Sequence, residues 1–119
     1  MIQLYTQYKG DGKTYKVLLN EGNGAGGPWA KTPSWQTDLR TTADQVQETT
    51  LEFNSFKPSF GGRGASRNEL NSYIFEAEEM KQLGLMLSLK LSNGDVNPVE
   101  TFGEGIFDFR LEIHDISFV

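Results

Sequence analysis

The chain contains no cysteine, which excludes disulfide bonds, thiolate nucleophiles and cysteine-based zinc sites. It has only one histidine, His114; a histidine metal site or a catalytic triad needs partners, and only Asp115 lies beside it in the sequence. No stretch approaches the roughly 20 apolar residues of a membrane-spanning helix. Basic residues are also few: 11 Lys and Arg face 16 Asp and Glu, giving a net charge of −5. A nucleic acid would therefore be repelled on average.

Glycine, by contrast, is abundant, with 13 residues in a chain of 119. Such a share indicates many turns and hence many short strands. Period-two alternation of apolar and polar residues predicts strands, each with one buried face, near residues 2–8, 14–19, 34–40, 46–53, 84–91 and 106–118. These elements predict one all-β sandwich domain spanning residues 1–119.

Three local features refine this prediction. Pro58 should end the strand that begins at Val46, because proline cannot donate a hydrogen bond to a neighbouring strand. A short helical turn is expected over 75–82, where acidic residues precede a lysine. In the last strand, Asp115 allows a kink before Ile116.

The stretch YKGDGKTYKV, residues 8–17, could be a tight turn or a phosphate-binding loop. Lys13 and Thr14 follow a glycine as in a phosphate loop, but the spacing between the glycines is wrong and a strand follows instead of a helix. We therefore interpret the stretch as a turn in which Asp11 bonds its own backbone. Two alternating runs joined by so short a link predict a β-hairpin.

Four segments in chain order resemble the complex I intermediate-associated protein 30 family. The family has the pattern Trp-Gln-x-Val-x-Leu-Pro-Phe-x-x-Phe-x-Pro, followed by an aromatic residue and arginines. Residues 46–63 match this pattern at seven positions: Gln47, Leu51, Phe53, Phe56, Pro58, Phe60 and Arg63. Val46 and Glu52 depart from it, standing where the family has tryptophan and proline. The other matching segments are the Gly-Asp-Gly-x-x-Tyr motif in 9–19, the helix-to-strand passage in 80–88 and the closing strand in 105–118.

The resemblance implies a galactose-binding-like jelly-roll β-sandwich and a role in assembling large membrane-bound electron-transfer complexes, either respiratory complex I or a photosystem. The loop 90–105 is similar to the photosynthetic branch of the family. Family domains have further strands before the Gly-Asp-Gly motif. We therefore expect that the chain lacks N-terminal strands of the domain, and either that Met1 is not the natural start of the domain or that a partner covers the gap.

The candidate partner-binding residues are an aromatic and two arginines in one loop, Phe60, Arg63 and Arg67, together with Trp29 in the glycine loop. Aromatic residues and arginine are common anchors of protein interfaces. A plain solvated loop is the alternative for the first three. Trp29 could instead stack on a sugar ring or cap an edge, whereas Trp35 is expected in the core.

Other candidate sites are weaker. Asn93, Asp95 and Asn97 alternate oxygen ligands around a glycine, but the bidentate glutamate of a calcium loop is not at its expected place. Glu76, Glu78 and Glu79 suit a solvated helix start, and His114 has only Asp115 beside it.

We therefore expect a non-enzymatic scaffold without a cofactor, peripheral to a plastid or mitochondrial membrane, whose partners are protein subunits of a membrane complex. A carbohydrate-binding module is the alternative, by analogy of fold alone.

Overall fold

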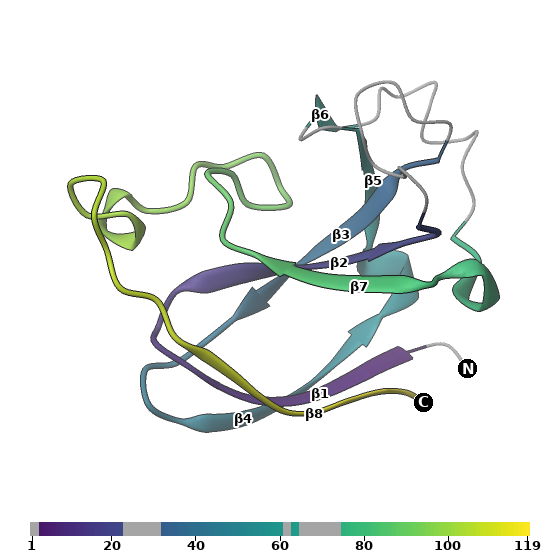
Figure 1. The fold of residues 1–119 in the computed structure, drawn as a ribbon, viewed down its shortest axis with the longest axis horizontal. Helices are drawn as coiled ribbons and strands as arrows, with labels where there is room; N and C mark the ends of the chain where they lie inside the picture. Colours follow the sequence, from purple (N-terminus) through teal and green to yellow (C-terminus); the bar gives the residue numbers. More distant parts are fainter. Residues whose placement is uncertain (1–2, 23–31, 61–62, 65–74) are drawn as a thin grey trace.

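The computed structural model describes residues 3–22, 32–60, 63–64 and 75–119. Its named strands form two antiparallel sheets, of three strands in the order β4-β1-β8 and of five in the order β6-β5-β3-β2-β7 (Figure 1). The strands are β1 (Gln3–Gly10), β2 (Thr14–Asn20), β3 (Ser34–Arg40), β4 (Val46–Glu52), β5 (Lys57–Phe60), β6 (Arg63–Gly64), β7 (Gln82–Met86) and β8 (Leu111–Phe118). The predicted all-β class is confirmed; the jelly-roll, galactose-binding-like topology stays a prediction.

Helical structure in the described residues is limited to three single 3₁₀ turns, η1 (Phe53–Ser55), η2 (Ala77–Glu79) and η3 (Val99–Thr101). The turn η2 lies inside the predicted helical segment, and Glu78 and Glu79 are exposed there. The expectation of a short, solvated, acidic turn is thus confirmed.

The predicted β-hairpin of the first two strands is wrong, because β1 and β2 belong to different sheets. β1 pairs with β4 and β8, whereas β2 pairs with β3 and β7. The link of residues 11–13 is therefore a crossover between sheets. Both strands bury one face in the shared core. Their apolar and polar residues therefore alternate in the same way as they would in the two strands of a hairpin. Gly10 is required at the corner, because an added Cβ would lie 2.3 Å from the Thr41 Cβ.

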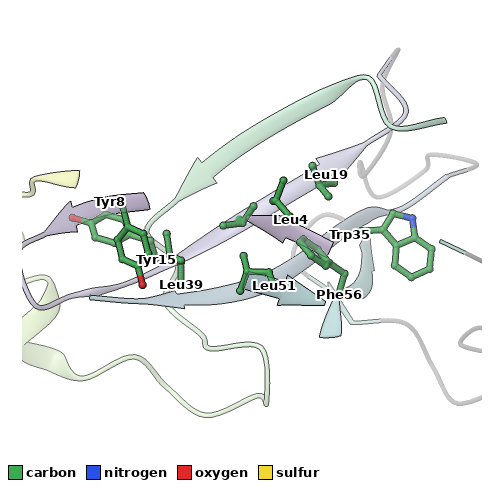
Figure 2. Packing of buried hydrophobic residues seen from close by; sticks show 9 residues of the cluster. Leu4, Tyr8, Tyr15, Leu19, Trp35, Leu39, Leu51 and Phe56 are labelled. Atoms are coloured by element: carbon green, nitrogen blue, oxygen red, sulfur yellow. The ribbon is translucent and has the colours of Figure 1, made fainter. Parts of the chain in front are cut away.

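The core lies between the two sheets. Its buried side chains include Leu4 and Tyr8 from β1, with the remaining members Tyr15, Val17, Leu19, Trp35, Leu39, Leu51 and Phe56 (Figure 2). The Tyr8 hydroxyl donates to the Arg40 carbonyl at 2.8 Å and lies 3.0 Å from the Thr49 hydroxyl, so its polar end is satisfied. Trp35 is 6% exposed, which confirms its predicted place in the core.

Pro58 does not end strand structure, contrary to the prediction. β4 ends earlier, at Glu52, and Pro58 lies inside β5, opposite Trp35 of β3. The pairing with β6 begins only at Ser59, so on that side Pro58 has no partner strand among the described residues. A missing N–H is tolerated at such a position.

The last two strands are shorter than predicted. Strand β7 covers Gln82–Met86 rather than 84–91, and β8 begins at Leu111 rather than at residue 106. β8 contains a bulge, because Gln7 pairs with Asp115 while Tyr8 pairs with Ile113, leaving His114 as the extra residue. The bulge lies one residue before the predicted kink, and it lets Ile113 and Ile116, three residues apart, both pack against the core.

The Thr6 hydroxyl is fully buried and has no hydrogen-bond partner among the described residues. Replacing a buried, unsatisfied polar group by an apolar group of the same shape removes a desolvation cost of about 1–3 kcal/mol. We predict that Thr6→Val raises the free energy of unfolding by about 1 kcal/mol in urea denaturation. The matched control is Thr49→Val, which removes a partner of Tyr8 and should lower it by a similar amount. A loss of stability in Thr6→Val would contradict the prediction.

Candidate functional site

The chain between β7 and β8, residues 87–110, leaves the sandwich as a long excursion (Figure 1). It carries most of the strongly exposed large apolar side chains of the described structure. We call five of these the apolar platform: Leu89, Val96, Val99, Ile106 and Phe109, which are between 69% and 95% exposed. Because these residues are concentrated in one segment of the chain, the excursion is a candidate interaction site.

The first half of the excursion is a tight hairpin-like turn held to β3. The Leu91 N–H donates to the Asp95 carbonyl at 2.8 Å, and Gly94 has a φ of +91° in between. Asp38 of β3 accepts hydrogen bonds from both the N–H and the hydroxyl of Ser92, at 3.0 Å and 2.8 Å to Oδ1. A charged acceptor with two donors fixes this turn against the five-stranded sheet.

Asn97 holds the middle of the excursion. It is 3% exposed, and its Nδ2 donates to the carbonyls of Thr14 at 3.2 Å and Ser88 at 3.0 Å. Its Oδ1 accepts from the Thr101 hydroxyl at 3.3 Å. The amide thus joins β2, the segment just after β7, and η3.

These contacts also bear on the candidate calcium ligands. Asn93 and Asp95 bond to one another at the exposed tip, while Asn97 bonds inward. The three side chains are therefore not brought together. Among the residues that the structure describes, no group of three or more acidic, histidine or cysteine side chains is placed to hold a metal ion.

Asp11 holds the far end of the excursion, where it joins β8. Its carboxylate accepts from the Lys13 N–H at 3.2 Å, which confirms the predicted turn, and Gly12 has the positive φ of +93° that such a turn favours. It also accepts from the Tyr15 hydroxyl at 3.0 Å and 3.1 Å and from the Arg110 N–H at 2.8 Å. One carboxylate therefore connects the crossover, β2 and the start of β8.

Protonation of this group is linked to its contacts. Burial raises the pKa of Asp11, but the hydrogen bonds from Arg110, Lys13 and Tyr15 lower it more, so the pKa lies below its ordinary value of 3.8. Burial and the hydrogen bond to Asp11 raise the pKa of Tyr15 to about 12. The pair is therefore held as a carboxylate and a neutral phenol over the physiological range.

An aromatic contact supports the same end of the excursion. The Lys13 ammonium lies 4.6 Å from the centre of the Phe107 ring, and that ring meets Phe102 edge-on at 5.3 Å between centroids. A cation over an aromatic face is favourable, and more so when it is partly desolvated. Phe107 is thus anchored, whereas its neighbours Ile106 and Phe109 project their side chains to solvent.

Comparison with known proteins decides the family. The sequence matches the profile of the Complex I intermediate-associated protein 30 (CIA30) family over residues 1–113. The chain belongs to this family. No curated protein and no solved structure gives a significant match. The family match confirms the resemblance found in the sequence. The CIA30 family is associated with complex I assembly.

The structure places the four predicted partner-binding residues of this CIA30 chain in different environments. Phe60 is only 4% exposed, because it ends strand β5 with its side chain packed inside, so it is not available as a surface anchor. Arg63 lies in β6 opposite Phe60. Trp29 and Arg67 lie outside the described residues, and the binding roles of these three stay predictions. His114 is exposed at the bulge, with Glu112 3.7 Å from it.

The apolar platform was missed in the sequence because Leu89 and Phe109 continue the alternation of neighbouring strands and were assigned to a buried face. The sequence does contain a signal for two of these residues, since Val96 and Val99 stand among glycine, asparagine and proline, where no strand was predicted to bury them. Among the described residues no helix is both long and apolar enough to cross a membrane.

The pKa values of Asp11 and Tyr15 predict how stability depends on pH. The folded pKa of Asp11 is lowered, so its contribution is complete above the unfolded pKa of about 4 and is lost as pH falls through the lower folded value. The folded pKa of Tyr15 is raised to about 12, so its contribution is complete below about pH 10 and is lost between these values.

We predict that Asp11→Asn lowers the free energy of unfolding by about 2 kcal/mol at pH 7, since charge-assisted hydrogen bonds are lost. The variant should also flatten the decline in stability below pH about 4. Urea denaturation across pH measures both effects. The control is Glu104→Gln, an exposed carboxylate on the same excursion, which should leave the curve unchanged. An unchanged acid limb in Asp11→Asn would refute the assignment.

Proposed function

We propose that this CIA30 family member is a non-catalytic accessory or assembly module that docks on a protein subunit of a complex I assembly intermediate. The observation that carries the proposal is the family match, which extends over residues 1–113. The sequence of the matched region includes β1 to β7, the whole excursion and the first residues of β8. The matched region of this chain therefore contains the residues of the apolar platform.

The platform supports a protein partner rather than a small ligand. Its five side chains stand on a backbone held by Asp38, Asn97 and Asp11, so little conformational entropy remains to be lost on binding. The apolar side chains of the platform have the composition of an interface core. Arg110, which is exposed and follows Phe109 in the chain, has the character of the polar rim.

The described titratable side chains support a structural role more than a catalytic one. Both Asp11 oxygens already accept hydrogen bonds from donors of the scaffold, and Tyr15 is 3% exposed. His114 is positioned next to Glu112 on the outside of β8, and no described nucleophile accompanies it. None of these three side chains is therefore arranged with both a nucleophile and an orienting group.

The proposed location is the periphery of the membrane that contains the complex, because docking on a complex I intermediate takes place there. A photosystem intermediate in a plastid is the alternative partner. Arg63, Arg67 and Trp29 are proposed as secondary contacts at the other loops, where their side chains would add polar and aromatic anchors.

We predict that the double variant Ile106→Ser/Phe109→Ser recovers about tenfold less complex I subunits than the wild-type chain, because both side chains lose apolar contact with the partner. The tagged proteins are exposed to solubilised native membranes, and the bound fraction is resolved on a native gel and identified by mass spectrometry.

The control is Val46→Ser on β4, a 54% exposed apolar residue outside the platform, which should bind as the wild type does. Equal recovery of complex I subunits by the double variant would refute docking through the platform. Recovery of photosystem subunits in place of complex I subunits would refute the proposed partner, and binding to glycans alone would refute the scaffold role.

A further inference from the structure

The two sheets of the sandwich have different numbers of strands, three and five, and the apolar face of the edge strand β7 is partly exposed. Across the β2–β7 pair, Leu83 lies opposite Leu19 and Leu85 opposite Val17. Residues directly opposite in an antiparallel pair share a face of the sheet, so both β7 leucines lie on the core face. Leu19 and Val17 are at most 1% exposed, yet Leu83 and Leu85 are 42% and 40% exposed. Leu85 borders a hollow that Phe107, Phe109 and Leu111 also line, so it is only partly covered.

The edges of the two sheets differ in how they are protected from pairing with another chain. Edge strands are normally blunted by charge, bulges or short length. β4 carries Glu48 and Glu52, β8 has a bulge and charged residues, and β6 is two residues long. β7, with the sequence QLGLM, contains no charge, no proline and no recorded bulge. Within the described structure it is the one unprotected edge.

We propose that β7 of one molecule pairs antiparallel with β7 of a second copy of this chain, about a two-fold axis at Gly84. Leu83 of each copy then lies opposite Leu85 of the other, which extends the apolar core face across the junction. The two five-stranded sheets become one continuous sheet. Closed two-fold pairing is the commonest form of self-association because one surface serves both partners.

The charges beside β7 select this occupant and this orientation. Two exposed acidic residues, Glu78 and Glu79, and one exposed lysine, Lys81, precede β7, whereas Lys90 follows it and Lys16 lies on β2 opposite Met86. Antiparallel pairing about Gly84 brings Glu78 and Glu79 of each copy toward the end of β7 that Lys90 follows in the other copy. Parallel pairing would place like charges together, which is unfavourable. A second copy therefore supplies both the apolar strand and the opposite charge order that this edge fits.

Gly84 at the centre is consistent with close pairing. Its φ is not in the positive range, and a Cβ added there would make only an ordinary contact of 3.8 Å with the Leu18 Cβ. The protomer itself therefore does not require glycine at this position. At the two-fold axis, the absence of side chains lets the two backbones approach without steric conflict.

The test is sedimentation velocity of the chain over concentrations from about 1 to 100 μM. A dimer is expected for the wild type, with a dissociation constant raised about tenfold or more in Leu85→Lys, which places two like charges across the junction. Val46→Lys on the β4 edge is the matched control and should leave the dissociation constant unchanged.

A second pair of variants, which reverses the charge of one acidic and one basic residue, tests the proposal if Leu85→Lys fails to fold. Glu78→Lys and Lys90→Glu alter exposed residues and should each raise the dissociation constant about fivefold, while the double variant restores wild-type association. A wild-type chain that is monomeric at about 100 μM, or a dimer that neither Leu85→Lys nor the charge variants weaken, would overturn the proposal. These outcomes do not depend on the platform, so failure here leaves complex I docking intact.

Discussion

The hydrogen bonds of the Asp11 carboxylate are the constraint on which the arrangement depends. The chain must pass from one sheet to the other in three residues, and 99 residues later it must return to the same corner to begin β8. The Lys13 N–H and the Arg110 N–H meet at this carboxylate. Because acceptors with full charge form the stronger hydrogen bonds, a single side chain can hold both passages.

The arrangement of the rest of the excursion follows from this attachment of its far end to Asp11. With its ends tied to β7 and to Asp11, the segment 87–110 is a closed loop whose interior contacts are made by Asp38 and Asn97. Its apolar side chains cannot all reach the core, so several remain exposed on an ordered backbone. This member of a family associated with complex I assembly thus combines a sandwich with exposed apolar side chains on one ordered segment.

Much of the fold could be predicted from the sequence, but only where information is local. The alternation in residues 2–8, 14–19 and 34–40 predicted β1, β2 and β3, and the Asx turn at Asp11 was predicted from residue type. Alternation does not specify which strand is the partner, so the first two strands were wrongly paired. The carboxylate's contact with Arg110 joins distant residues and had no local signal.

The ends of β7 and β8 show a second limit. Leu87 to Leu91 and Ile106 to Arg110 alternate as well as any strand, and a periodic pattern cannot distinguish an apolar residue that is buried from one kept exposed for a partner. Residues of the platform were therefore assigned to strands. The family, by contrast, was recognisable from short motifs in the right order, since these do not depend on burial.

Backbone amide hydrogen exchange tests the central claim, that the excursion is an ordered platform closed by Asp11. The account predicts that the amides of Leu91, Asn97 and Arg110 exchange as slowly as those of β1 and β2, and that Asp11→Ala accelerates exchange at Arg110 while β3 stays protected. Exchange of these three amides at the rate of unstructured peptide in the wild-type chain would contradict it.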